Sequence, residues 1–286
     1  MKLGCCLLAS DLNPDYLDFF PLVQKAWREI VGVDVRMVLI AQDLPRHLRQ
    51  FEAAIRLFRP VPGLHTAFQA QCVRLLFPAL LHDECRDAVL LSDMDILPLS
   101  RRYFTRPPEN LGADKFLMYR AGRLRGQVPM MYNAALPSTW AEIFPAIRDE
   151  TDVAQVLGAW WAEGKDYGIR KGAGWFTDQD KLYSHLNAWE GAAGKGRLVR
   201  LTDGKTGLCR LDRSRPDEFR RNLARQSHLL RAGYFADFHM MQPPSEHEAL
   251  NLQVFAEAHT PPSSSDRALA AVRKWARACR SGLLRR

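Results

Sequence analysis

The sequence predicts an α/β protein with a mainly parallel central sheet flanked by helices, followed by an amphipathic C-terminal helix. In the first half, short apolar runs without a helical period alternate with amphipathic stretches, which is the order expected of strands joined by crossover helices. Apolar residues make up 47% of the 286 residues and charged residues 25%, the mix of a globular protein with a sizeable core. No apolar run approaches the ~20 residues that span a bilayer, so the sequence does not predict an integral membrane protein.

The first half supplies three strands and two helices. Lys2–Ser10 is a short apolar run without a 3.6-residue period and predicts a buried strand. An amphipathic helix is expected from Pro14 to Ile30, and a second strand over Val33–Ala41. Thr66–His82 has helical spacing, with a proline near its end that should bend it or mark its last turn. Asp87–Leu91 predicts the third strand.

The second half is less regular, and its elements are expected in mixed order. The predicted strands are Lys115–Tyr119, Val128–Ala135, Leu198–Thr202, Gly207–Leu211 and Tyr234–Met241. The predicted helices are Thr139–Glu150, Thr151–Glu163, a short helix that ends at Leu186, and Glu246–Ala258. The composition of Thr260–Ser265 is typical of a linker. We therefore expect one α/β body over residues 1–258, with a linker and a basic helix over 259–286.

The cysteines predict a reducing compartment. The adjacent Cys5 and Cys6 could suggest a lipoprotein signal, but the apolar run stops at Ala9 and no hydrophobic region precedes the cysteines. The six cysteines form no CxxC pair, which favours free thiols over a disulfide framework. The expected location is the cytoplasm.

Charge is concentrated at the C-terminal end. Residues 266–286 hold seven basic residues against Asp266 alone, which is +6 of the total net charge of +8. The body is nearly neutral, so no nucleic-acid partner is expected. On a helical wheel the tail places Leu269, Val272, Trp275, Ala276, Cys279 and Leu283 on one arc and its basic residues on the other. This pattern predicts peripheral binding to an anionic membrane surface, on the inner face of the cytoplasmic membrane, or packing of the apolar arc on the body.

The sharpest motif follows the third strand. Leu91 leads into Ser92-Asp93-Met94-Asp95, so two carboxylates leave the end of a buried strand two residues apart. Burying two anions is costly unless a cation neutralises them, and Mg²⁺ and Mn²⁺ prefer carboxylate oxygens. The motif predicts either a metal site or a solvated pair of loop aspartates.

In its position in the chain, this stretch resembles the metal-binding DxD of GT-A-fold (Rossmann-like) glycosyltransferases, and in particular the family 8-like enzymes. Four further segments are similar to those of the family and occur in its order. They are Ala9-Ser10-Asp11 with Tyr16, Arg74 on the preceding helix, Asn133 with Trp140 downstream, and Asp178-Gln179 with the late His239.

The resemblance implies a metal-dependent transfer of a sugar from a nucleotide-sugar donor, with a UDP-sugar expected, to a hydroxyl of a glycan or glycolipid acceptor. The implied enzyme is a hexosyltransferase in bacterial surface glycan synthesis. The implied ligands of Mn²⁺ (or Mg²⁺) are Asp93, Asp95 and His239. The implied donor-binding residues are Ala9, Ser10, Asp11, Arg74, Asp93, Met94 and Asn133, and the implied catalytic residues are Asp178 and Gln179. Asp178 would deprotonate the acceptor if the reaction inverts the anomeric centre, and both residues would surround the reacting face of the sugar if it retains.

One departure from the family concerns the diphosphate. Many members place a lysine before the proline of the late motif, whereas this chain has Gln242 before Pro243. Arg74, Arg170 and Lys171 are the cations that could replace that lysine.

Three other classes compete with this interpretation. Haloacid-dehalogenase-like phosphatases also carry a strand-end DxD, but on their first strand and with a later acidic pair that is absent here. Sugar-nucleotide pyrophosphorylases have a glycine-rich segment that is missing after Ala9. A non-catalytic GT-A-like sugar-binding or scaffold protein is the third alternative. Outside the family context, a histidine such as His239 is more often structural than a ligand.

Overall fold

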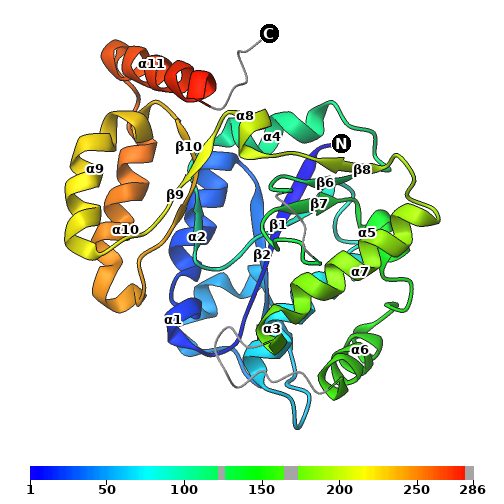
Figure 1. The fold of residues 1–286 in the computed structure, drawn as a ribbon. Coiled ribbons are helices and arrows are strands. Elements are labelled where there is room, and N and C mark those ends of the chain that lie inside the picture. The colour runs from blue at the N-terminus through cyan, green and yellow to red at the C-terminus, as the bar shows by residue number, and fades with distance from the viewer. Residues whose placement is uncertain (122–125, 164–172, 281–286) are drawn as a thin grey trace. The chain divides into compact units, whose positions relative to one another are not determined.

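The computed structural model describes residues 1–121, 126–163 and 173–280, which divide into two compact units (Figure 1). The first unit comprises residues 1–13, 33–94 and 108–201, and the second comprises residues 14–32, 95–107 and 202–286. The boundary between the units falls between Met94 and Asp95, so the two aspartates of the DxD motif belong to different units.

A seven-stranded sheet organises the first unit, in the order β3-β2-β1-β4-β7-β6-β8. Its strands are β1 (Leu3–Ser10), β2 (Asp34–Ile40), β3 (Ile55–Phe58), β4 (Ala88–Leu91), β6 (Phe116–Met118), β7 (Asn133–Ala135) and β8 (Leu198–Arg200). Only β7 runs antiparallel to its neighbours, while the other described pairings of this sheet are parallel. The predicted α/β class with a mainly parallel central sheet is therefore confirmed.

Helices pack on this sheet and enclose the core of the first unit. They are η2 (Arg46–Ala54), α3 (Thr66–Leu76), η3 (Phe77–Leu80), α5 (Pro137–Ile143), α6 (Glu150–Ala162), η4 (Ala173–Phe176) and α7 (Thr177–Gly191). The core joins apolar faces of α3, α5, α6 and α7 to the sheet, with Trp140 fully buried against Phe116. Trp140 is therefore a core residue of the first unit, as expected for an apolar side chain on the inner face of a helix.

Local sequence explains where these helices begin and end. The side chain of Asp149 accepts hydrogen bonds from the backbone N–H groups of Thr151 and Asp152, which caps the start of α6. The predicted helix over Thr66–His82 is α-helical only to Leu76 and continues as the 3-10 turn η3, because Pro78 cannot supply the next intrahelical hydrogen bond.

Close packing of backbone and side chains fixes the start of β1. A Cβ atom at Gly4 would lie 2.7 Å from Sγ of Cys85 and 2.8 Å from Cβ of Asp87. Cys5, the next residue, donates its thiol hydrogen to Sγ of Cys85 over 3.9 Å. The loop that precedes β4 therefore lies against the first strand with no room for a side chain at position 4.

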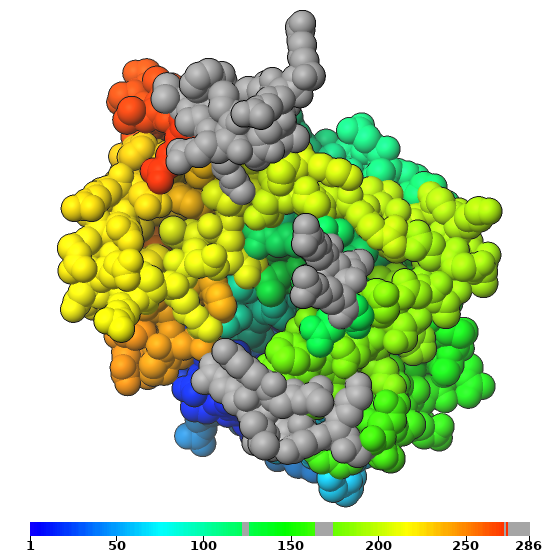
Figure 2. Space-filling model, viewed as in Figure 1, coloured from blue at the N-terminus to red at the C-terminus, as the bar shows by residue number. Residues whose placement is uncertain are grey.

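A small sheet and several helices form the second unit. Its strands are β5 (Ile96–Pro98), β9 (Cys209–Leu211) and β10 (Phe235–His239), in the order β5-β10-β9. Its helices are α1 (Pro14–Leu17), α2 (Phe20–Ala26), η1 (Trp27–Val31), α4 (Arg101–Glu109), α8 (Asp203–Thr206), α9 (Pro216–Arg231), α10 (Pro244–His259) and α11 (Ser264–Arg280). Figure 2 shows α9, in yellow, at the surface of this unit.

The C-terminal helix α11 packs against α9 and is anchored by its first turn. Nη2 of Arg231 donates to Asp266 over 3.1 Å, and Nε of the same guanidinium donates to the other carboxylate oxygen over 3.1 Å. Asp266 also accepts hydrogen bonds from the backbone N–H and the hydroxyl of Ser263. The helix begins at Ser264 and so includes the last two residues of the predicted linker. Leu283 and the other residues beyond Arg280 lie outside the described part of the chain.

Several element predictions differ from the structure. The predicted strand Val128–Ala135 is extended only at Asn133–Ala135, because Pro129 has no N–H for a ladder and the Asn133 side chain folds the preceding segment into a turn. The predicted helix over Thr139–Glu150 is wrong in extent, since α5 ends at Ile143. Helices α4 and α9 and strands β3 and β5 were not predicted from the sequence. Within the described residues, none of the helices combines the length and apolar character needed to cross a bilayer.

Candidate functional site

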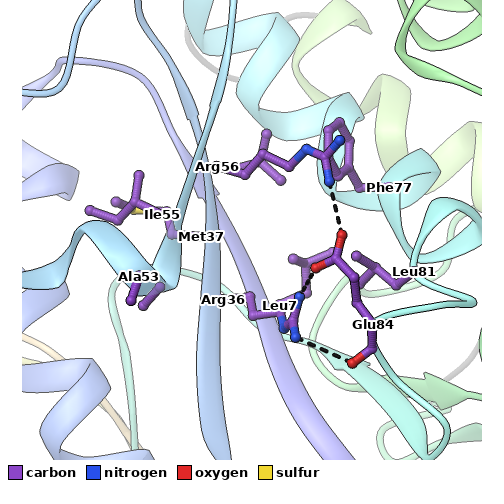
Figure 3. Close-up of a pocket in the computed structure, with 11 residues that line it drawn as sticks. Leu7, Arg36, Met37, Ala53, Ile55, Arg56, Phe77, Leu81 and Glu84 are labelled. Atoms are coloured by element: carbon purple, nitrogen blue, oxygen red, sulfur yellow. Dashed lines mark hydrogen bonds and ion pairs between the residues drawn. The ribbon is translucent and has the colours of Figure 1, made fainter.

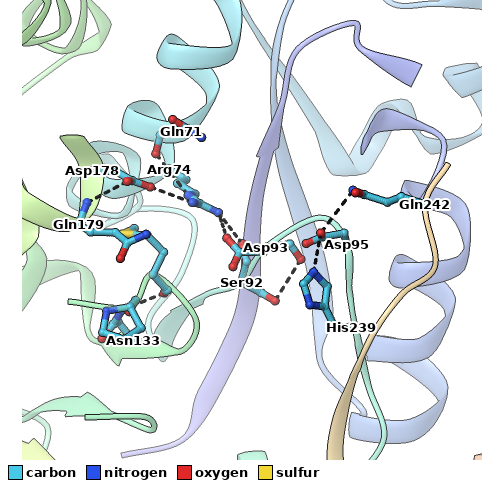
Figure 4. Close-up of polar contacts among 12 residues, drawn as sticks. Gln71, Arg74, Ser92, Asp93, Asp95, Asn133, Asp178, Gln179, His239 and Gln242 are labelled. Atoms are coloured by element: carbon cyan, nitrogen blue, oxygen red, sulfur yellow. Dashed lines mark hydrogen bonds and ion pairs between the residues drawn. The ribbon is translucent and has the colours of Figure 1, made fainter. Parts of the chain in front are cut away.

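In the first unit, the predicted site residues meet at Arg74. Nη1 of Arg74 donates to Oδ1 of Asp93, and Nη2 donates to Oδ2 of Asp178 over 2.8 Å (Figure 4). Nε of Arg74 also donates to the backbone carbonyl of Gln71 over 3.3 Å, which fixes the guanidinium on its own helix. One cation therefore joins two carboxylates that the sequence assigns to donor binding and catalysis.

The positions of Arg74, Asp93 and Asp178 at the ends of their elements explain why these side chains lie together. Arg74 lies in the last turn of α3, and Asp93 follows the end of the buried strand β4 by two residues. Asp178 is the second residue of α7, where the helix dipole favours a negative charge. Oδ1 of Asp178 also accepts a hydrogen bond from the backbone N–H of Gln179 over 2.8 Å.

Burial and charge pairing act in opposite directions in this cluster. The side chain of Asp178 is 2% exposed, and burial raises the pKa of that carboxyl although the charge of Arg74 acts in the opposite direction. Burial alone would lower the pKa of the Arg74 guanidinium, but the attraction of Asp93 and Asp178 outweighs it and the pKa is raised. The guanidinium therefore stays charged, and both oxygens of Asp178 are hydrogen-bonded in this conformation.

The remaining predicted donor residues of this unit lie at strand ends. Ala9 and Ser10 end β1, and Asp11 follows them. Oδ2 of Asp11 accepts a hydrogen bond from the hydroxyl of Thr66 over 2.8 Å, which ties this segment to the start of α3. Met94 is buried.

Asn133 is buried on β7. Its amide nitrogen donates to the carbonyl oxygens of Pro129 and Met130, each over 2.8 Å. These two contacts shape its own loop. Its described role is therefore structural, and its role in donor binding stays a prediction.

In the second unit, two of the predicted metal ligands, Asp95 and His239, lie side by side. Nε2 of His239 lies 3.0 Å from Oδ2 of Asp95, although the residues are 144 positions apart. Antiparallel pairing of β5 with β10 sets this contact, because His239 lies opposite Ile96. The backbone N–H of Met240 donates to the carbonyl of Asp95 over 2.9 Å, which fixes the register.

Two further side chains surround Asp95. Nε2 of Gln242 donates to Oδ2 of Asp95 over 3.4 Å, and Nη1 of Arg213 lies 3.7 Å from the same oxygen (Figure 4 shows Gln242). Burial alone would raise the pKa of Asp95, but the hydrogen bond and charge of His239, with the charge of Arg213, hold it below the ordinary value. Asp95 is therefore an anion in this surrounding.

Arg213 is the residue that sequence reasoning missed. It follows β9, and its Nη1 donates to the carbonyl of Met240 over 3.1 Å. No motif marks it, because its position beside Asp95 depends on the long-range pairing of β9 with β10. Two of the cations proposed in place of the missing lysine, Arg170 and Lys171, lie outside the described residues.

The residues present fit a divalent cation in part. Asp95 and His239 offer one carboxylate and one imidazole, a donor set that suits Mn²⁺. Asp93, the third predicted ligand, is held by Arg74. Within residues 1–121, 126–163 and 173–280, no group of three or more His, Cys, Asp or Glu side chains is placed to hold a metal ion.

A separate pocket in the first unit contains none of the predicted residues. It has a volume of about 320 Å³ and lies beside β2 and β3 (Figure 3). Arg36 and Arg56 both contact the carboxylate of Glu84 at its edge. Arg56 also pairs with Glu150, so the two carboxylates balance the two arginines and this pocket offers no chemistry comparable to that around Asp95.

No family model matches the sequence, and no curated protein matches it. Among solved structures, the chain is similar to the glycosyltransferase GlyE of Streptococcus pneumoniae TIGR4, with 13% identity and a TM-score of 0.44 over 97% of this chain and 64% of that chain. It is also similar to a cytidylyltransferase of Leptospira borgpetersenii serovar Hardjo-bovis, with 12% identity and a TM-score of 0.36 over 56% of this chain and 70% of that chain. It is also similar to the bifunctional glycosyltransferase WbbM, with 12% identity and a TM-score of 0.42 over 95% of this chain and 52% of that chain. The chain thus spans less than two thirds of GlyE and about half of WbbM.

Proposed function

We propose that the protein is a metal-dependent glycosyltransferase that moves a sugar from a nucleotide-sugar donor to a hydroxyl of an acceptor. The observation that supports this most directly is the contact of Asp95 with His239, 3.0 Å apart at the end of a DxD motif that follows a buried parallel strand. The carboxylate and the imidazole come from distant parts of the sequence, and both are partly exposed. Together they offer a metal ion one hard oxygen ligand and one borderline nitrogen ligand.

Mn²⁺ or Mg²⁺ is the proposed cofactor, and Asp95 and His239 would hold it together with the predicted ligand Asp93. When bound, such an ion acts as a Lewis acid that offsets the charge of a departing diphosphate. The low pKa of Asp95 supports this role, because a ligating carboxylate must be ionised.

Arg213 and Gln242 are proposed to bind the diphosphate on the same side of the second unit. Arg213 carries a positive charge beside Asp95, and the carbonyl of Met240 orients its guanidinium. Gln242 adds an amide donor where the family pattern has a lysine. We propose that Arg213 supplies the charge that the missing lysine would supply.

Arg74 and Asp178 are proposed to act in the first unit. Asp178 is buried and both its oxygens are engaged, so in this conformation it orients Arg74. The raised pKa of Asp178 is also compatible with the proposed role of accepting a proton from the acceptor in an inverting reaction. In a retaining reaction, Asp178 and Gln179 would instead line the face of the reacting sugar.

The finer parts of the proposal concern the substrates. We propose a UDP-sugar as donor, a hexosyl group as the transferred sugar, and a glycan or glycolipid of a bacterial surface as acceptor. The proposed location is the cytoplasm, with peripheral binding to the inner face of the membrane.

Release of nucleoside diphosphate tests the proposal. The full chain is incubated with a panel of nucleotide sugars and Mn²⁺, and the released nucleotide is measured with and without EDTA. We expect release with at least one UDP-sugar, its loss in EDTA and its recovery when Mn²⁺ is added back. Asp95→Asn and His239→Ala should suppress release, whereas the exposed Asp43→Asn, a matched control in the first unit, should not.

The competing functions give different results in the same assay. A phosphatase would release inorganic phosphate from phosphorylated sugars and leave nucleotide sugars intact. A non-catalytic sugar-binding protein would be stabilised by a nucleotide sugar without releasing nucleotide. Full release in EDTA would contradict the metal dependence.

A further inference from the structure

A pocket in the second unit, lined by none of the residues proposed for sugar transfer, has an unusual charge balance. Its volume is about 310 Å³. The lining residues come from the start of α4 and the residue before it, the end of α8 and the segment after it, the segment before β10, and the first half of α11. They are Ser100, Arg102, Thr206, Leu208, Ala232, Gly233, Tyr234, Arg267, Ala270 and Ala271.

Two arginines and no carboxylate line this pocket. None of the described residues forms a hydrogen bond or ion pair with the exposed guanidinium of Arg102. Arg267 uses one nitrogen, Nη1, to donate to the backbone carbonyl of Pro262 over 2.8 Å, which neutralises none of its charge. The pocket thus presents two uncompensated positive charges, a field that favours an anion.

The other lining residues suit a ligand with a polar and an apolar part. Ser100, Thr206 and Tyr234 bring hydroxyl groups, whereas Leu208 and the alanines of α11 are apolar. Next to the pocket residues on α11, Leu269 is 53% exposed. An apolar side chain exposed beside basic ones is typical of helices that lie at a membrane interface.

The anchoring of α11 makes the pocket a preformed feature. Asp266 is held by Arg231 and Ser263, so the turn that contributes Arg267 is fixed to α9. Asp266 is the only acidic residue of positions 266–286 in the sequence, and its charge is paired with Arg231. The seven basic residues of the same segment therefore make its net charge positive.

We propose that this pocket binds the phosphate of an anionic lipid headgroup at a membrane surface, with Arg102 and Arg267 as its ligands and α11 lying along the interface. The site is distinct from the residues proposed for sugar transfer. Its function is to hold the protein at an anionic membrane.

Co-sedimentation of the full chain with vesicles tests this site. Vesicles of phosphatidylcholine with phosphatidylglycerol are compared with vesicles of phosphatidylcholine alone at low salt. The double variant Arg102→Ala with Arg267→Ala should bind the anionic vesicles about 30-fold more weakly, since each basic residue at such a surface contributes about fivefold. The control Arg221→Ala with Arg225→Ala removes the same charge from exposed positions of α9 and should change binding only a few-fold.

A second variant separates the pocket from net charge. Ala271→Trp at an exposed position of α11 fills the pocket and keeps every arginine, and it should also weaken binding to anionic vesicles. Equal losses in the two double variants, with no effect of Ala271→Trp, would overturn the pocket in favour of diffuse attraction. Thermal stabilisation by inorganic phosphate that depends on Arg102 and Arg267, with no vesicle binding, would overturn the lipid assignment.

Discussion

Nη2 of Arg74 donates to Oδ2 of Asp178 over 2.8 Å, although 104 positions separate the two residues and they lie on different helices. The same guanidinium reaches Asp93 at the end of β4. One side chain therefore links a helix start, a helix end and a strand end, so the stability of the first unit and the geometry of its proposed donor site depend on the same contact.

Arg74→Ala should lower the free energy of unfolding at neutral pH by about 3–5 kcal/mol, because it leaves the buried carboxylate of Asp178 without its cationic partner. Urea unfolding followed by circular dichroism measures the change. The variant should recover part of this loss as the pH falls, since a carboxyl whose folded-state pKa is raised becomes neutral before the unfolded chain does. Stability therefore declines as the pH rises through that raised pKa. A second substitution, Asp178→Asn, should restore much of the loss in Arg74→Ala, and no recovery in the double variant would contradict the explanation.

Arg213→Ala should lower kcat/KM for the nucleotide-sugar donor by about 10–100-fold, because a hydrogen bond to a charged group contributes about 1.5–3 kcal/mol. Arg213→Lys keeps the charge but loses the fork of donors, so an intermediate value is expected. Steady-state nucleotide release measures both variants, with the exposed Arg221→Ala as the control. A value of kcat/KM for Arg213→Ala equal to that of the control would remove Arg213 from the proposed diphosphate site.

The attachment of α11 to α9 through Asp266 should depend on pH. Its hydrogen bond with Arg231, and then those with Ser263, hold the pKa of this carboxyl well below its usual range. The stabilisation is therefore complete above the ordinary aspartate pKa of about 4 and is lost as the pH falls below it. Hydrogen exchange of the α11 amides should accelerate in that range, and Asp266→Asn should show the faster exchange already at neutral pH. Asp217→Asn, an exposed position of α9, should not change the profile.

Cys85 should be the most reactive of the described cysteines of the first unit. The hydrogen bond from the thiol of Cys5 lowers the pKa of Cys85 to about 7, whereas burial raises the pKa of Cys6. Limited treatment with iodoacetamide at neutral pH, followed by peptide mass mapping, should modify Cys85 before Cys5, Cys6 and Cys72. Cys5→Ala removes the hydrogen bond and should slow the reaction of Cys85, and an unchanged rate would contradict this cause.

Much of the fold could be predicted from the sequence where the signal is local. The three apolar runs that precede Asp93 are strands β1, β2 and β4, because each is short, apolar and bounded by turn residues. The amphipathic stretch before β4 is α3, and Pro78 marks its change to a tighter turn. The highly charged α9 was missed although Phe219, Leu223 and Leu230 have helical spacing, since its many charges hide a narrow apolar stripe.

The contacts of the candidate site were less predictable than its residues. The motif order indicated Asp95 and His239 together, and the pairing of β5 with β10 brings them to 3.0 Å. No local pattern could indicate that Arg213 lies beside Asp95, because that contact depends on parallel pairing between two very short strands. Likewise, the sequence marked Arg74 and Asp178 as separate donor and catalytic residues and gave no sign that they bind each other.

The crowding around Gly4 has an evolutionary consequence. With Cys85 Sγ only 2.7 Å from a Cβ at this position, a larger residue there demands a smaller one in the loop before β4. In homologous sequences, alanine or serine at position 4 should therefore coincide with glycine or alanine at position 85 and with glycine at position 87, because the Cβ of Asp87 would also lie 2.8 Å from the added Cβ. Such paired substitutions would mark lineages that have lost the reactive thiol while keeping the register of the first strand.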